Sequence, residues 1–253
     1  MRRAPWAAVV LLAAGCVTEP EPGSLPPRAK PDMVEASKLN TDLANDYIRK
    51  GQIDGAIEKV RRALEQNPNN AQAHATYAIV LGSRGDAANA DSEFRRALSL
   101  QDDPGTRNNY GVFLCGEKRY ADAEAMFMKA AQDRTYRTPE VAWSNAGQCA
   151  RRVPDLPKSE RYFRQALQVR ADYPEALAQL SWIALQSKDY LRARAFLQRY
   201  EKVGPDTPET LWIGAQTESA LGDTAAAQAY SNRLREQFPE SDESSRSPQA
   251  PPS

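Results

Sequence analysis

The chain has 253 residues, and its 33 Lys and Arg balance its 33 Asp and Glu, so the formal net charge is +0. This balance leaves no overall basic field for nucleic acid and no acidic tail. Charged residues make up 26% of the chain and aromatic residues only 8%. Together with abundant alanine, this composition is typical of an all-helical protein with thin, repeated packing layers.

Residues 1–15 have the pattern of an export signal. Two arginines precede an apolar stretch, residues 6–14, that is too short to span a bilayer. Residues 12–16 read Leu-Ala-Ala-Gly-Cys and resemble the bacterial lipobox, although Ala13 stands where that motif usually has Leu. We therefore expect cleavage before Cys16 and lipidation of its thiol. The alternative is an ordinary signal peptide, or an uncleaved anchor, that happens to contain this cysteine.

Both ends of the mature chain differ in composition from its middle. Val17 follows Cys16, whereas Asp at that place typically retains a Gram-negative lipoprotein in the inner membrane, so we expect a lipid anchor in the outer membrane, facing the periplasm. Residues 16–33 are rich in proline and predict a flexible tether. Residues 240–253 are rich in Ser, Pro, Glu and Asp and predict a disordered tail. The predicted folded part is residues 34–239.

The folded part repeats itself about every 34 residues. A first helix carries a small residue, and a second helix carries the pattern Ala–aromatic–Ala, often followed by proline. This spacing is that of the tetratricopeptide repeat (TPR). The second halves are Ala56-Val60-Ala63, Ala90-Phe94-Ala97, Ala123-Phe127-Ala130, Ser159-Phe163-Ala166, Ala193-Leu197-Tyr200 and Ala227-Ser231-Leu234.

Such helix pairs are predicted to stack in a row. One pair cannot bury its own apolar face, so each packs on the next, and small residues let the paired helices approach closely. We predict an all-α, right-handed TPR superhelix (an α-solenoid) of about six repeats, with the sixth as a cap. A generic Ala-rich bundle is disfavoured because six registers agree. The predicted repeats span roughly residues 37–70, 71–103, 104–139, 140–173, 174–207 and 208–239.

Residues that could carry catalysis are scarce. His74 is the only histidine, and because no partner motif accompanies it, a packing or surface role is favoured over that of a general base. The sequence has no Gly-rich phosphate loop, no Cys-x-x-Cys pair and no His–Glu metal motif. We therefore expect no catalysis, no cofactor and no metal.

Cys115 and Cys149 fall late in the first helices of the third and fourth repeats. In the repeat register these helices are neighbours, and the two positions are compatible with the Cα separation of about 5.5 Å that a disulfide requires. Export would place them in an oxidising compartment. We predict a Cys115–Cys149 disulfide, with two buried free thiols as the alternative.

Stacked repeats curve and present a groove lined mainly by their first helices. Asn45 alone matches the two-carboxylate clamp of chaperone-binding repeats, since Arg49 and Gln72 depart from it, so a C-terminal carboxylate ligand is not supported. A mixed polar and apolar groove fits an extended or helical peptide. Any of its residues could instead be merely solvent-facing. By register, the predicted groove wall is Thr41, Asn45, Ile48, Ala75, Ile79, Asn108 and Val112.

Three runs resemble one family beyond the repeat itself: residues 108–115 (NNYGVFLC), 145–149 (NAGQC) and 159–167 (SERYFRQAL). With the lipobox and six repeats, they resemble the PilF/PilW family of type IV pilus biogenesis lipoproteins over nearly the whole mature body. The resemblance implies a pilotin on the inner leaflet of the outer membrane, which helps the secretin multimerise and reach that membrane. Cys115 and Cys149 match the family's cysteine pair, while the C-terminal tail looks like an addition.

We therefore expect a monomeric scaffold whose partner is a secretin subunit, anchored to a membrane and without nucleic acid. A TPR scaffold lipoprotein of another envelope assembly or polysaccharide export system is the second interpretation. A third is an enzyme subunit or regulator whose repeats dock a hydrolase. That third reading would need a catalytic constellation on the concave face.

Overall fold

The computed structural model describes residues 32–153 and 155–246, and within them the chain is all helical, without strands. The prediction of an all-α TPR solenoid is confirmed. None of the helices within residues 32–153 and 155–246 combines the length and the hydropathy of a membrane span. The paired helices are α1 (Met33–Arg49) and α2 (Ile53–Gln66), α3 (Ala71–Ser83) and α4 (Ala87–Leu100), α5 (Pro104–Gly116) and α6 (Tyr120–Gln132), α7 (Pro139–Arg152) and α8 (Leu156–Val169), α9 (Pro174–Gln186) and α10 (Tyr190–Tyr200), and α11 (Pro208–Ala220) and α12 (Thr224–Gln237).

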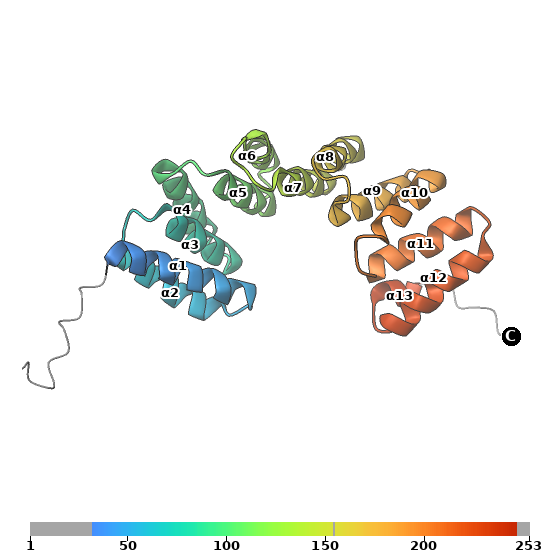
Figure 1. The fold of residues 1–253 in the computed structure, drawn as a ribbon, viewed down its shortest axis with the longest axis horizontal. Helices are drawn as coiled ribbons and strands as arrows, with labels where there is room; N and C mark the ends of the chain where they lie inside the picture. The colour runs from blue at the N-terminus through green and yellow to red at the C-terminus, as the bar shows by residue number, and fades with distance from the viewer. Residues whose placement is uncertain (1–31, 154, 247–253) are drawn as a thin grey trace, which may run out of the picture. The chain divides into compact units, whose positions relative to one another are not determined.

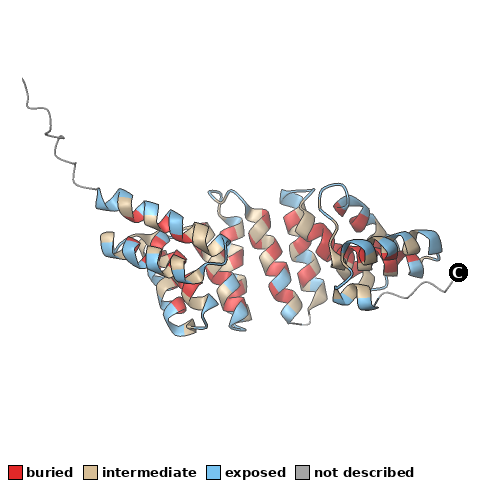
Figure 2. Ribbon diagram, turned by 90° about the horizontal axis from the view of Figure 1, so that it is seen from below, coloured by how far each residue is buried: buried red, intermediate tan, exposed pale blue. Residues whose placement is uncertain are grey.

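Within Met33–Arg246 the pairs follow one another in an arc, with α5 and α7 on its inner side and α6 and α8 on its outer side (Figure 1). First helices also contact the first helix of the next pair, as α3 does with α5 and α5 with α7. Buried residues occur on every pair rather than around one centre (Figure 2). The apolar core accordingly divides into successive clusters, each shared by neighbouring pairs.

Local sequence sets where the helices begin and where the pairs turn. Proline occupies the first position of α5, α7, α9 and α11, where its missing N–H costs no hydrogen bond. The tight turns within five of the pairs contain a residue with positive φ, such as Gly51 with a φ of 70°. Side chains that accept a hydrogen bond from a first-turn N–H, and so cap a helix, come from Asn70, Asp86, Asp103, Asp155, Asp189 and Asp223.

In the pairs α5–α6 and α7–α8, a glycine of the first helix faces an aromatic ring of the second. A Cβ added to Gly111 would lie 2.6 Å from Cε1 of Phe127, and one added to Gly147 would lie 2.9 Å from the ring of Phe163. Both phenylalanines are fully buried. Any larger side chain at these glycines would therefore force the two helices apart or displace the ring.

A disulfide joins α5 to α7, as the repeat register predicts. Cys115 and Cys149 are bonded, and their Cα atoms lie 5.9 Å apart. Both cysteines are buried. The bond therefore fixes the first helices of two successive repeats to each other.

Part of the C-terminal tail is helical, contrary to the prediction from its composition. Residues 240–253 were expected to be disordered, but α13 (Asp242–Arg246) forms a short helix that contacts α11 and α12. The hydroxyl of Ser241 accepts a hydrogen bond from the backbone N–H of Ser244 at 3.1 Å. This bond caps the start of α13, and the prediction of disorder, which rested on low apolar content, did not consider it. The predicted signal peptide, Cys16, the tether through residue 31, Pro154 and residues 247–253 lie outside the described residues.

Gly111→Ala should lower the free energy of unfolding by about 1–3 kcal/mol, because the added methyl overlaps Phe127 in a packed core. Gly116→Ala in the same helix is the matched control, since a Cβ there meets no atom within 4 Å. The control should be neutral or stabilise by up to about 1 kcal/mol, the difference in helix propensity. Urea unfolding of both variants measures the effect, and equal midpoints would contradict this account of the glycine–aromatic contact.

Replacing both cysteines, as in Cys115→Ser with Cys149→Ser, should cost about 2–4 kcal/mol, since the bridge closes a loop across 34 residues. Wild-type protein treated with a reductant should show the same loss. Peptide mass mapping without reductant checks the bond itself. Alkylation of both thiols in untreated protein would show that the bridge does not form.

Candidate functional site

A hollow of about 510 Å³, here called the central hollow, lies among the first helices α3, α5 and α7. Its floor includes buried Phe94 of α4. The only ionisable side chain that lines it is that of Glu117. Ser83, whose hydroxyl donates to the carbonyl of Val80, also lines it, and its other walls are formed by apolar side chains and by side-chain amides. These are Ile79, Val112, Phe113 and Val141, together with Asn108, Asn109 and Asn145.

Three residues of the predicted groove wall come together in this hollow. They are Ile79 of α3 and Asn108 and Val112 of α5. Val112 keeps 49% of its surface exposed, although it is a large apolar residue. Asn45 and Ile48 are half-buried on α1 and do not line the central hollow.

For two residues of the predicted wall, the prediction is wrong. Thr41 and Ala75 are each only 1% exposed, so they belong to the packing between helices and not to an open wall. The Thr41 hydroxyl donates to the carbonyl of Ser37 at 2.8 Å and accepts from Nδ2 of Asn70 at 3.2 Å. These partners turn it toward the next repeat, which the register alone does not reveal.

An asparagine pair crosses from α5 to α7 in the central hollow. Nδ2 of Asn145 donates to Oδ1 of Asn108 at 2.9 Å, and Asn108 is only 6% exposed. Asn109, which is half-buried, makes no side-chain hydrogen bond within the described part of the chain. The hollow therefore combines apolar walls with amide groups that still have free hydrogen-bonding capacity.

Sequence reasoning missed a second cluster, formed by α7 and α9. The Arg151 guanidinium lies over the Trp182 ring, with its carbon 3.8 Å from the ring centroid. It also donates to Oε1 of Gln179, and burial lowers its pKa. The repeat register could have predicted this position, because Trp182 follows the small residue Ser181 just as Val112 follows Gly111.

An acidic hollow of about 490 Å³ lies beside this cluster, among α9, α11 and α13. Glu175, Glu209 and Glu243 contribute three carboxylates to its lining, and Gln179 is shared with the cluster. Burial raises the pKa of Glu209, the charges of Glu175 and Glu243 raise it further, and Arg151 opposes them. The short tail helix α13 thus brings a charge into this part of the molecule.

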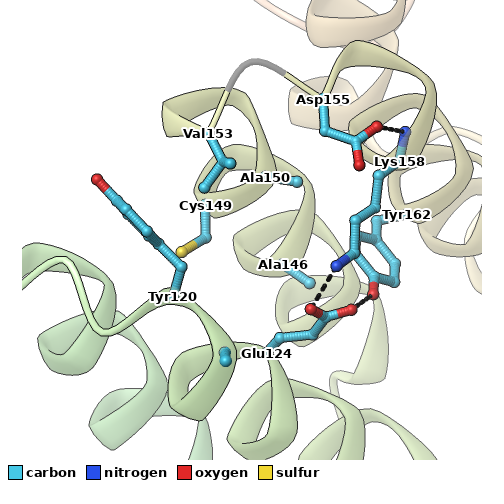
Figure 3. A pocket seen from close by; sticks show the side chains of 10 residues that line it. Tyr120, Glu124, Ala146, Cys149, Ala150, Val153, Asp155, Lys158 and Tyr162 are labelled. Carbon is cyan, nitrogen blue, oxygen red and sulfur yellow. Dashed lines mark hydrogen bonds and ion pairs between the residues drawn. The ribbon is translucent and has the colours of Figure 1, made fainter.

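A third hollow, of about 190 Å³, opens between α6, α7 and α8 (Figure 3). Glu124 accepts hydrogen bonds from Nζ of Lys158 at 2.5 Å and from the Tyr162 hydroxyl. Burial, followed by the hydrogen bond to Glu124, raises the pKa of Tyr162. These polar groups bond to one another across two repeats, so the cluster is a structural link.

The imidazole ring of His74 is held by two contacts within the protein. Its Nδ1 lies 2.5 Å from Oε2 of Glu93, and its Nε2 lies 3.0 Å from the carbonyl oxygen of Pro68. Both ring nitrogens thus face oxygen atoms of the protein itself, one of them on the following helix α4. Within residues 32–153 and 155–246, no group of three or more His, Cys, Asp or Glu side chains is placed to hold a metal ion.

Comparison with known proteins agrees with this architecture. Residues 41–106 and 155–212 each match a tetratricopeptide-repeat family model. The chain is 28% identical to the type IV pilus assembly protein PilF of Pseudomonas aeruginosa, over 92% of this chain and 94% of that protein. The solved structure of P. aeruginosa PilF matches with a TM-score of 0.74 at 26% identity, covering 84% of this chain and 96% of that one. The crystal structure of PilW, a widely conserved type IV pilus biogenesis factor, matches with a TM-score of 0.72 at 31% identity, covering 83% and 96%.

The chain belongs to the PilF/PilW-like family of TPR proteins. The resemblance read from the sequence is therefore confirmed at the level of the family. The TPR solenoid of this family is a protein-interaction fold. The central hollow and the Arg151–Trp182 cluster both lie on the side formed by the first helices of the pairs, here called the first-helix face.

Glu209→Gln should stabilise this PilF/PilW-like protein at pH 7 but not at about pH 4. A carboxyl whose pKa is raised on folding contributes stability below its unfolded pKa of about 4.3, and that stability is lost as the pH rises through the folded pKa. Glutamine removes the ionised form that burial disfavours. Urea midpoints at both pH values measure the difference, with exposed Glu240→Gln as the control. A gain at pH 4 as large as that at pH 7 would contradict the argument.

Proposed function

We propose that this protein is a pilotin of type IV pilus biogenesis, a lipid-anchored scaffold that binds the secretin subunit, promotes its multimerisation and brings it to the outer membrane. The observation that carries the proposal is the match along almost the full length of PilF, a type IV pilus assembly protein, and PilW, a type IV pilus biogenesis factor. Both are matched over at least 94% of their own length.

The first-helix face supports binding of a polypeptide. The central hollow provides apolar contact and amide groups, and Gln148, Arg151 and Trp182 continue the same face along α7 and α9. An uninterrupted row of first helices can follow an extended chain over several repeats. A partner held there would be kept from other contacts until it is released.

The membrane part of the proposal rests on the sequence. Residues 12–16 resemble a lipobox ending in Cys16, and Val17 follows where a retention signal would place Asp. Acyl chains on Cys16 would hold the scaffold on a membrane, because each buried CH₂ contributes about 0.8 kcal/mol. A partner bound to an anchored scaffold is confined near that membrane, which raises its effective concentration for assembly there.

Deletion of the gene should reduce heat-resistant secretin multimers in outer-membrane fractions at least tenfold, and the full chain supplied in trans should restore them. Cys16→Ser should leave secretin unassembled or in the inner membrane, because the unanchored scaffold cannot confine it. Immunoblots of separated membranes measure both effects. Unchanged multimers in the deletion strain would overturn the pilotin proposal, and full rescue by Cys16→Ser would overturn the role of the anchor.

A further inference from the structure

We propose that the central hollow recognises an extended, uncharged segment of the partner protein, by enclosing a bulky apolar side chain and bonding the partner's main chain to the amides of α5 and α7. This inference rests on the proposed function only in taking the occupant to be a protein. It commits to the conformation and chemistry of the bound segment, which the family match does not specify.

The walls of the central hollow favour an apolar side chain. Ile79, Phe113 and Val141 surround the space, and Val112 is half exposed at its edge. A volume of about 510 Å³ falls within the usual range of binding pockets, which are mostly apolar with a few placed polar groups. Covering Val112 would remove apolar surface from water, and this favours binding.

The charge of the hollow disfavours a charged segment. Glu117 is the only ionisable residue in its lining, so an acidic side chain would find no cation there and would meet a like charge. A basic side chain would have to give up its hydration among apolar walls and amides, where one carboxylate at the edge compensates only in part. The acidic hollow with Glu175, Glu209 and Glu243 offers basic groups a better place.

The amides decide between an extended and a helical segment. Asn108 uses Oδ1 to accept from Asn145, which leaves Nδ2 of Asn108, Oδ1 of Asn145 and the whole Asn109 amide without a partner among residues 32–153 and 155–246. None of these atoms is sealed from solvent. An extended chain presents free N–H and C=O groups that can pair with such amides, whereas a helix has already paired its own. The hollow therefore suits an extended main chain.

The walls are also held in place before the partner arrives. The Asn145–Asn108 hydrogen bond and the Cys115–Cys149 disulfide both tie α7 to α5, at 2.9 Å between the amide atoms and 5.9 Å between the cysteine Cα atoms. A site whose walls are already fixed loses less conformational freedom on binding, which favours affinity.

The test uses the full-length lipoprotein with the photo-crosslinking residue p-benzoylphenylalanine at Val112, in cells that assemble pili. Leu191, 68% exposed on α10, is the matched control position. Mass spectrometry of the crosslinked peptide should identify an uncharged segment with a long aliphatic or aromatic residue at the crosslink. A crosslink at Val112 to a segment rich in charge, or no crosslink above that at Leu191, would overturn the inference.

Binding by variants separates this inference from the pilotin proposal. Val112→Glu should weaken secretin capture at least tenfold and Asn109→Ala about three- to tenfold, while Leu191→Glu should leave it unchanged. Equal thermal midpoints would show that Val112→Glu, at an exposed position, keeps the fold. Capture by Val112→Glu equal to wild type would sink the inference and leave the pilotin proposal standing. A crosslink to an uncharged segment of an identified protein other than secretin, lost in Asn109→Ala, would support the inference and refute the pilotin proposal.

Discussion

The structure depends on the contact of a small residue in one helix with a large ring in its paired helix. Gly111 meets Phe127, Gly147 meets Phe163, and Gly214 meets Tyr230, in each case so closely that a Cβ would collide. In these three pairs the contact sets how closely the two helices cross, and in every pair the packing hides only one side of the apolar surface, so each pair must pack on the next. A row of pairs follows, with a core divided into successive clusters. The same arrangement leaves one side of the first helices without a covering helix, and the central hollow lies there.

Hydrogen bonds between repeats complement this packing. Asp91 of α4 accepts from the Tyr110 hydroxyl at 2.6 Å and from Arg119 at 2.7 Å, and Glu124 of α6 accepts from Lys158 and Tyr162 of the following pair. A buried carboxylate is tolerated in such a place because cationic and hydroxyl donors satisfy it together. The first helices α5 and α7 are joined instead by an amide pair and a disulfide. The ionic hydrogen bonds thus join neighbouring repeats through α4, α6 and α8, whereas neutral amides line the central hollow.

The helix pairs, their registers and the cysteine pairing could be predicted because they depend on spacing within one repeat. The sixth repeat shows the limit of this reasoning, since Tyr230 fills the space beside Gly214 while the expected slot at Ser231 holds no ring. The groove wall was harder to predict. Periodicity tells which side of a helix faces inward, but not how far the next repeat covers it, and Thr41 and Ala75 are covered where Val112 is open. The hydrogen bonds of Ser241 that support α13 are likewise local and leave no periodic signal.

The unpaired amides of the central hollow bear on selectivity as much as on affinity. A partner that covered Asn108 and Asn109 without offering main-chain groups would bury their donors and acceptors unsatisfied, at a cost of about 1–3 kcal/mol for each such group. In the proposed binding mode, a segment whose main chain is already paired in its own folded or assembled protein would therefore be disfavoured by the same groups that would hold an extended one. Binding in the hollow and main-chain pairing within the partner's own structure would then compete for that segment. Under the proposed function, such a scaffold would hold its partner only while the partner's main chain is unpaired, and assembly of the partner would itself favour release.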